Sequence, residues 1–166
     1  MIYVIYHKNC NDGTASAWTA WLKFGKNAKY IPHMYNEDPP IIPADCEYLY
    51  ILDYSFPRII MDKFYEQLNG NIQVIDHHKT AEENLKGFPK CVFDMTQCGA
   101  VLSWKFFHPD KKLPIFLEYI QDYDIWTKKL PYTDEVSAYI NSFDRNIENF
   151  NIFKSTFETT FESVVK

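Results

Sequence analysis

Hydrophobic and polar residues alternate in blocks along the first half of the chain. Apolar, β-rich runs cover Ile2–Tyr6, Tyr48–Leu52 and Ile72–Ile75, and a weaker run covers Lys29–His33. Runs of this length and composition predict strands. Because strands that are apolar along their whole length are typical of a sheet covered on both faces, the pattern favours a parallel sheet.

Segments with helical spacing lie between these strands. Gly13–Phe24 places apolar residues on one face and ends at Gly25, and Arg58–Leu68 has the same character. A third helix is predicted after Ile75, opened by Thr80 and Glu83 in capping-box spacing. The stretch "DPPIIP" is predicted to be a loop because prolines this dense do not fit a helix or central strand. Alternating strands and helices indicate βαβ units.

The second half of the chain predicts helices only. They are expected at Gly99–Phe107, at Pro114–Tyr123, at about Thr133–Asn141, and from about Ile147 through the tail. We therefore predict an α/β fold: a doubly wound, mainly parallel sheet of about five strands flanked by helices (residues 1–95), followed by a helical C-terminal part (residues 96–166). At 166 residues, these two parts are expected to form a single domain.

The tail carries phenylalanines at helical spacing. Phe150, Phe153, Phe157 and Phe161 fit one buried helical face. Exposure of part of that face would favour a homodimer.

Composition and charge narrow the range of functions. Hydrophobic residues make up 46% of the chain and charged residues 23%, as in ordinary globular proteins. The net charge of −5 argues against a groove for long duplex nucleic acid, which normally shows a basic face. The only arginines are Arg58 and Arg145. Small anionic substrates remain compatible with this composition if metal ions supply positive charge.

The cysteines and the amino terminus bear on the compartment. Cys10, Cys46, Cys91 and Cys98 show no C-x-x-C spacing, so neither a zinc ribbon nor a redox pair is indicated. The first residues lack the apolar core of a signal peptide, and no apolar run reaches membrane length. We expect a cytoplasmic protein with no membrane partner.

Three expected strand ends carry side chains that bind metals. They are His7, Cys10 and Asp12 after the first strand, Asp53 after the third, and Asp76, His77 and His78 after the fourth. In open parallel sheets, ligands bind beyond the carboxyl ends of the strands, so these groups are expected to meet. Taken singly, each has a structural alternative: Asp12 could cap the helix at Gly13, and Asp53 could form a turn.

Two further features point to the same edge of the sheet. Asp122 and Asp124 lie near the carboxyl end of a predicted helix, where carboxylates are electrostatically disfavoured unless a cation offsets the cost. One of the pair could instead form a turn. Gly99 and Ala100 open another helix, whose free N–H groups could hold a phosphate or simply start the helix tightly.

Five motifs in order carry a family resemblance. They are "YHKNCNDGTASAW", "ILDYSFP", "DHHKTAE", "GAVLSW" and "QDYDIW". Together they resemble the DHH phosphoesterase superfamily. The exact sequences of the motifs are similar to those of a compact bacterial and phage subgroup related to nano-RNases and RecJ-type exonucleases. The resemblance runs from His7 to about Trp126, which is most of the chain.

The resemblance implies two divalent ions, commonly Mn²⁺, with Mg²⁺ or Co²⁺ as alternatives. It implies one ion held by His7 and Cys10, a bridging Asp53, and a second ion held by Asp12, His77 and Asp122, with the choice between Asp122 and Asp124 left open. His78 would face the scissile phosphate, and Asp76 would orient the histidines. From their positions in the sequence, Gly99 and Ala100 at a helix start and Lys79 beside the proposed ligands are the expected substrate contacts. For Lys79, a solvated surface lysine is the alternative.

The chain departs from the family pattern in two places. Cys10 stands where many relatives have an aspartate, so the thiol is either a soft ligand that favours a different metal or a neighbour that does not bind. Nothing after Trp126 resembles the family's second, substrate-binding domain. The expected function is a metal-dependent phosphoesterase that hydrolyses phosphodiester or phosphomonoester bonds of small nucleotides or short oligonucleotides by two-metal activation of water. The alternatives are an inorganic pyrophosphatase and a non-catalytic metal-binding or partner-binding relative.

Overall fold

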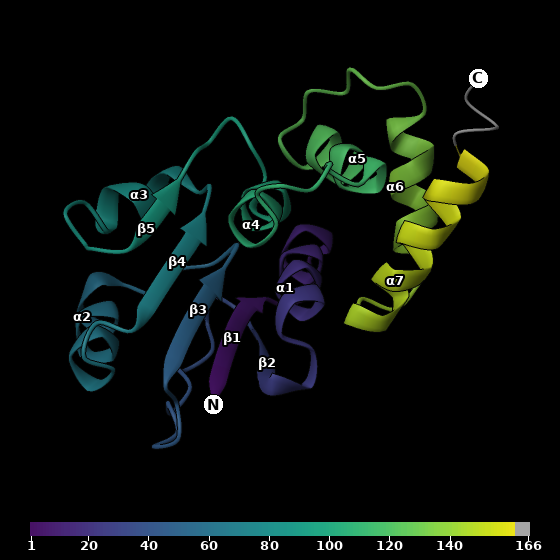
Figure 1. The fold of residues 1–166 in the computed structure, drawn as a ribbon. Coiled ribbons are helices and arrows are strands. Elements are labelled where there is room, and N and C mark those ends of the chain that lie inside the picture. The colour runs from purple at the N-terminus through teal and green to yellow at the C-terminus, as the bar shows by residue number, and fades with distance from the viewer. Residues whose placement is uncertain (162–166) are drawn as a thin grey trace.

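A five-stranded, all-parallel sheet forms the centre of the computed structural model, which describes residues 1–161 without the side chain of Phe161 (Figure 1). Its strands are β1 (Ile2–His7), β2 (Ala28–His33), β3 (Tyr48–Leu52), β4 (Ile72–Asp76) and β5 (Cys91–Phe93). They lie in the order β2-β1-β3-β4-β5, and every neighbouring pair is parallel. The predicted α/β fold is confirmed, and β5 is the strand that had not been placed.

Seven α-helices connect and follow these strands within the described residues. They are α1 (Asn11–Phe24), α2 (Arg58–Gln67), α3 (Lys79–Asn84), α4 (Gly99–Phe107), α5 (Ile115–Asp124), α6 (Thr133–Asn141) and α7 (Ile147–Thr156). A short 3₁₀ turn (Gly25–Asn27) follows α1, and a π-helical turn (Phe157–Phe161) follows α7. The part of the predicted tail helix after residue 161 lies outside the described residues.

The predicted capping box of α3 is wrong. The residue before the helix is His78, and its side chain makes no capping hydrogen bond. Asp76 accepts hydrogen bonds from the backbone N–H groups of His77 and His78, at 2.7 and 3.3 Å. A carboxylate two residues upstream therefore shapes the turn into α3, and Thr80 lies inside the helix.

Helices cover both faces of the sheet, as a doubly wound fold requires (Figure 1). On one face, Val4 and Leu52 pack with Ala17 of α1 and Leu102 of α4. The opposite face packs against α2 and α3 through a second buried cluster that includes Ile5, Ile51, Met61, Phe64 and Leu85. The alternation of Val4 and Ile5 between the two faces follows from the two-residue repeat of a strand.

The helical C-terminal part packs against the outside of α1 and α4. Its core joins Trp18 and Trp104 to Phe116, with the Trp18 and Trp104 rings stacked at a centroid distance of 5.9 Å. Phe150, Phe153 and Phe157 are buried in the same cluster, as predicted for the tail face, and Phe161 lies outside the described side chains. The homodimer stays a prediction.

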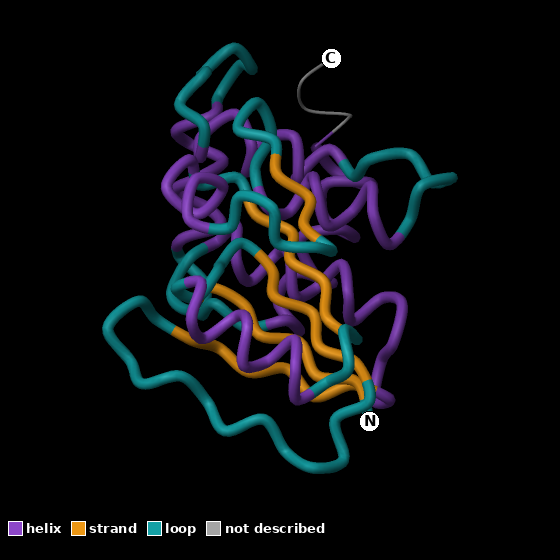
Figure 2. Tube along the Cα trace, turned by 90° about the vertical axis from the view of Figure 1, so that its left-hand side faces the viewer, coloured by secondary structure: helices purple, strands orange, loops and turns teal. Residues whose placement is uncertain are grey.

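The strand order places one edge of the sheet in a favourable position for a site. The chain adds β2 on one side of β1 and then β3 on the other, so the topology reverses between β1 and β3. Ligands bind at such a switch point, beyond the carboxyl ends of the strands. Figure 2 shows the strands side by side, with the long loop that joins β2 to β3 running outside the sheet. No helix within residues 1–161 is long and apolar enough to cross a bilayer.

Candidate metal centre

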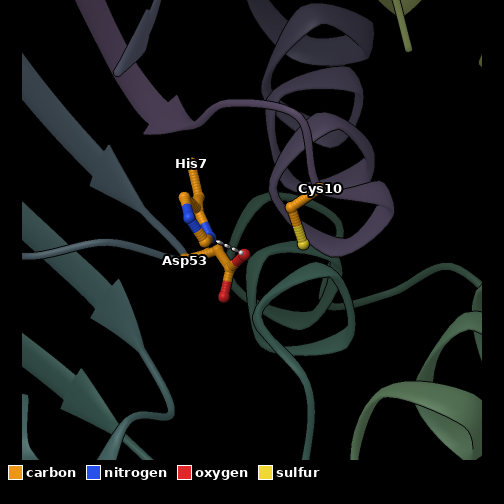
Figure 3. A group of neighbouring side chains, drawn as sticks. All are labelled: His7, Cys10 and Asp53. Carbon is orange, nitrogen blue, oxygen red and sulfur yellow. Dashed lines mark ion pairs between the residues drawn. The ribbon is translucent and has the colours of Figure 1, made fainter. Parts of the chain in front are cut away.

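The first group of ligand-type side chains gathers at the switch point (Figure 3). His7 is the last residue of β1, Cys10 precedes the first turn of α1, and Asp53 directly follows β3. One ligand atom from each lies within 4.8 Å of the other two. His7 Nδ1 is 3.6 Å from Asp53 Oδ2. This group could hold a metal ion.

Two glycines allow the backbone to approach closely enough for this convergence. A Cβ on Gly13 would lie 2.2 Å from the carbonyl oxygen of His7, so only glycine lets α1 start against the end of β1. A Cβ on Gly99 would lie 2.7 Å from the Cβ of Asp53. Asp53 itself has a positive φ of 51°, a conformation that costs free energy in a non-glycine residue and that clusters at functional sites.

A second group lies beside the first and involves His77. Its Nε2 is 3.2 Å from Asp53 Oδ1, 3.4 Å from Asp12 Oδ2 and 3.5 Å from Asp124 Oδ2. Asp12, His77 and Asp124 form one set with metal-ligand spacing, and Asp53, His77 and His78 form another. Asp53 and His77 each belong to two sets, so the sets overlap as a pair of adjacent ion positions with shared ligands would.

The side chain of Asp53 is the strongest sign that a cation belongs here. It is 1% exposed, and neither carboxylate oxygen has a hydrogen-bond partner among the described residues, although both histidine rings are near. Burial raises its pKa, but His7 and His77 outweigh burial and lower the pKa to about 2. A buried carboxylate that stays ionised is expected to be paired or to coordinate a metal. Here its described partners are the rings of His7 and His77, at 3.6 and 3.2 Å, and a metal ion bound to the same side chains would take over that pairing.

The carboxylates around Asp53 also favour a cation. Burial, and then repulsion from Asp53 and Asp124, raises the pKa of Asp12 well above its usual value. Burial and the charge of Asp53 raise the pKa of Asp124 in the same way. Burial lowers the pKa of His77, but the carboxylates of Asp53 and Asp12 outweigh it and raise that pKa to about 9. A divalent ion would replace this proton and relieve the repulsion between the acids.

Cys10 has the geometry of a ligand but the chemistry of a neutral thiol. Burial, followed by the charges of Asp53 and Asp12, raises its pKa. The thiolate is the form that binds metals, so an ion would have to displace a tightly held proton. Both alternatives from the sequence, a soft ligand and a non-binding neighbour, therefore stay open.

Asp76 orients one of the two histidines by its side chain. Its Oδ1 is 2.6 Å from His78 Nδ1, and this contact raises the pKa of His78. To His77 it is linked through the backbone N–H alone, because the His77 ring faces Asp12, Asp53 and Asp124. The predicted role of Asp76 thus applies to the ring of His78, and its second oxygen is buried without a hydrogen-bond partner in the described part of the chain.

The predicted ligand Asp122 is replaced by its alternative, Asp124. The Asp122 carboxylate accepts hydrogen bonds from Thr127 Oγ1 at 2.6 Å, Lys129 N at 2.8 Å and Leu130 N at 3.0 Å, and from the Thr133 hydroxyl. Burial raises its pKa, but these donors outweigh burial and lower the pKa to about 2. Asp122 therefore holds the loop after α5, while Asp124 lies in a ligand set with His77.

The predicted phosphate contacts of Gly99 and Ala100 are also corrected. Their backbone N–H groups donate to Asp12 Oδ2 and Oδ1, both at 2.7 Å, so the amino terminus of α4 already holds an anion from the chain itself. The alternative role predicted for Asp12 was to cap the helix at Gly13. Asp12 does cap a helix, but that helix is α4 rather than α1. Lys79 is 78% exposed and lies 4.0 Å from Glu83, which fits the solvated alternative.

Two residues beside the site gave no motif in the sequence. Tyr35, from the loop after β2, places its ring 5.2 Å from that of His7 and 6.2 Å from that of His78. Arg145, beyond α6, lines a cleft with Cys10 and Asp124. Both come from irregular segments, where spacing carries no information on what a side chain will meet.

Comparisons with known proteins support the fold and leave the family open. No family model matches the chain. The chain is 33% identical over 164 residues to the uncharacterized protein R106 of Acanthamoeba polyphaga mimivirus, covering 87% of this chain and 38% of that protein. A crystal structure of an uncharacterized protein from Helicobacter pylori G27 superposes with a TM-score of 0.61 at 16% identity, over 78% of this chain and 45% of that one. The chain thus spans less than half of each, and the second likeness concerns the fold alone.

Proposed function

We propose that this protein is a DHH-type, metal-dependent phosphoesterase acting on small nucleotides or short oligonucleotides. The observation that carries the proposal is Asp53: a buried, ionised carboxylate that faces the rings of His7 and His77 and is shared between two sets of ligand-type side chains. Motifs of the DHH resemblance contribute all of these side chains.

The residues present fit two divalent ions. His7 and Asp53, with Cys10 as the open candidate, would hold one, and Asp12, His77 and Asp124 the other. Such a pair supplies a hydroxide near neutral pH and neutralises charge on the attacking and leaving oxygens. Carboxylate and imidazole ligands suit Mn²⁺ or Mg²⁺, whereas a thiolate would shift the preference toward softer ions.

The remaining residues of the site would position the substrate and donate a proton to it. Asp76 accepts from Nδ1 of His78, which directs the proton of a charged imidazole at Nε2 toward a bound phosphate or leaving oxygen. Because the same contact raises the pKa of His78, a larger fraction of the ring is protonated near neutral pH. Tyr35 packs edge-on against the rings of His7 and His78 and would border a substrate bound beside them.

The test combines metal binding with turnover. Wild-type protein, Asp53→Asn and the control Asp110→Asn, which changes an exposed acid, would be titrated with Mn²⁺ by calorimetry. Each would then be incubated with dinucleotides, 3′-phosphoadenosine phosphate, cyclic dinucleotides and pyrophosphate. We expect Asp53→Asn alone to lose both Mn²⁺ binding and hydrolysis. Equal Mn²⁺ binding in all three proteins would refute the metal centre.

Other outcomes separate the alternatives. Mn²⁺ binding without turnover of any substrate, with Mg²⁺, Co²⁺ and Zn²⁺ also tried, would favour the non-catalytic relative. Turnover of pyrophosphate alone would favour the pyrophosphatase. The structure gives that second enzyme little support, because Arg145 is the sole lysine or arginine among the described residues that line the cleft beside the centre.

A further inference from the structure

A cleft of about 320 Å³ opens directly beside the candidate metal centre. Its lining includes Cys10, Asp12 and Asp124, which belong to the ligand sets, and Asn141 and Arg145 of the helical part. A group bound in this cleft would therefore lie beside both the centre and Arg145. The volume is at the lower end of the range for small-molecule sites, which suits one nucleoside-sized group.

Arg145 is held in place by two amides rather than by an acid. Its Nε donates to Asn11 Oδ1 at 3.1 Å, and its Nη2 donates to Asn141 Oδ1 at 2.7 Å. The Asn11 amide in turn donates to Asn141 Oδ1 at 3.0 Å. These contacts orient the exposed guanidinium and use two of its five N–H groups.

The charge of Arg145 is not neutralised within residues 1–161, where no carboxylate pairs with it. The contrast is Arg58, whose Nε lies 2.8 Å from Asp62 Oδ1. A chain with a net charge of −5 and two arginines thus leaves one oriented, uncompensated guanidinium in the cleft that adjoins its acidic centre. Planar, forked N–H donors of this kind match the oxygens of a phosphate.

We propose that Arg145, with Asn11 and Asn141, forms a subsite for a second phosphate of the substrate. This inference rests on the proposed function and adds a specificity to it: the preferred substrate carries a terminal phosphate in addition to the bond that is cleaved. Without Arg145, the Asp12 and Asp124 carboxylates that line the same cleft would repel that phosphate. Tyr123 and Ile140 also line the cleft and would offer apolar surface to the nucleoside of such a substrate.

The experiment compares three dinucleotides that differ only in a terminal phosphate: ApA, pApA with a 5′-phosphate and ApAp with a 3′-phosphate. Affinities would be measured by calorimetry in Ca²⁺, and hydrolysis would be followed separately in Mn²⁺ by chromatography. The proteins are wild type, Arg145→Gln, Arg145→Lys and the matched control Arg58→Gln. Thermal melts of each would verify that the variants are folded.

We expect wild type and Arg58→Gln to bind one of the phosphorylated dinucleotides at least about 10-fold more tightly than ApA, as a charge-assisted contact predicts. Arg145→Gln should reduce that ratio to within about twofold, and Arg145→Lys should retain part of it because the charge remains. Affinity for ApA should change little in any variant.

The subsite is overturned if wild type does not discriminate, if it binds none of the dinucleotides, or if Arg145→Gln keeps the ratio. The two proposals fail separately. Discrimination in Ca²⁺ without hydrolysis in Mn²⁺ would sustain the subsite and refute the phosphoesterase. Hydrolysis of all three dinucleotides at equal rates, with equal affinities, would sustain the phosphoesterase and refute the subsite.

Discussion

The two acids at the end of α5 have different roles, and isosteric substitutions separate them. Asp122 holds the following loop through four hydrogen bonds, whereas Asp124 lies in a ligand set with His77. Asp122→Asn should therefore destabilise the fold with or without metal. Asp124→Asn should leave the metal-free fold intact, or slightly more stable, because the raised pKa of Asp124 shows that its charge is unfavourable there.

The loss of unfolding free energy expected in Asp122→Asn follows from the hydrogen-bond donors that the carboxylate faces. Asparagine keeps one acceptor oxygen but turns an NH₂ group toward the remaining donors, so two of the four bonds are lost. At about 1.5 kcal/mol for each bond to a charged group, the free energy of unfolding should fall by about 3 kcal/mol. In a domain of this size, that lowers the melting temperature by about 6–12 °C.

The assay is a thermal melt in EDTA and again in Mn²⁺. At an ion concentration of about 100 times Kd, binding to the native state adds about 2.7 kcal/mol, or about 5–11 °C. Wild type, Asp122→Asn and the control Asp110→Asn should each gain this shift, and Asp124→Asn should gain little of it. The assignment is refuted if Asp124→Asn melts far below wild type in EDTA while Asp122→Asn loses the response to Mn²⁺.

Three further predictions concern individual side chains. Gly99→Ala places a Cβ against the Cβ of Asp53 and should cost about 1–3 kcal/mol in urea unfolding; an unchanged midpoint would contradict the close approach. Cys10→Ala should lower Mn²⁺ content if the thiol ligates beside His7, and unchanged metal content in both Cys10→Ala and Cys10→Asp removes it from the ligand set. Because the folded pKa of Asp122 is lowered to about 2, its stabilisation is present above its ordinary pKa of about 4 and is lost as pH falls from about 4 to about 2. Unfolding of wild type should steepen over that window, and Asp122→Asn should lack this component.

The sequence predicted the sheet well because its strands are long and apolar. The bounds of β3 and α4 agree to the residue, since each is a mainly apolar segment between polar turns. The strand β5, Cys91–Phe93, was not predicted because three half-buried residues are too few to show the alternation of apolar and polar residues that marks a strand. The capping box failed because the turn before α3 is held by Asp76 rather than by Thr80.

The candidate site was predictable where strand topology decides and not where packing decides. His7, Asp53 and His77 meet because parallel strands end at one edge of the sheet. The choice between Asp122 and Asp124 depends on the rotation of α5, because residues two apart on a helix point in different directions. That rotation is set by the loop that binds Asp122. The use of the Gly99 and Ala100 N–H groups depended on a partner 87 and 88 positions away.

The bond from Asp12 to the start of α4 has a consequence for cooperativity. It joins the first βα unit to the helical part, and Asp124 joins the same centre from α5. A fragment that ends at residue 95 would keep the "DHH" segment and all five strands. It would lack Asp124 and the groups that hold Asp12, so the ligand sets would be incomplete. A metal ion coordinated at this centre would therefore link the sheet to the helical part. Such an ion would suppress local separation of the two parts as well as global unfolding.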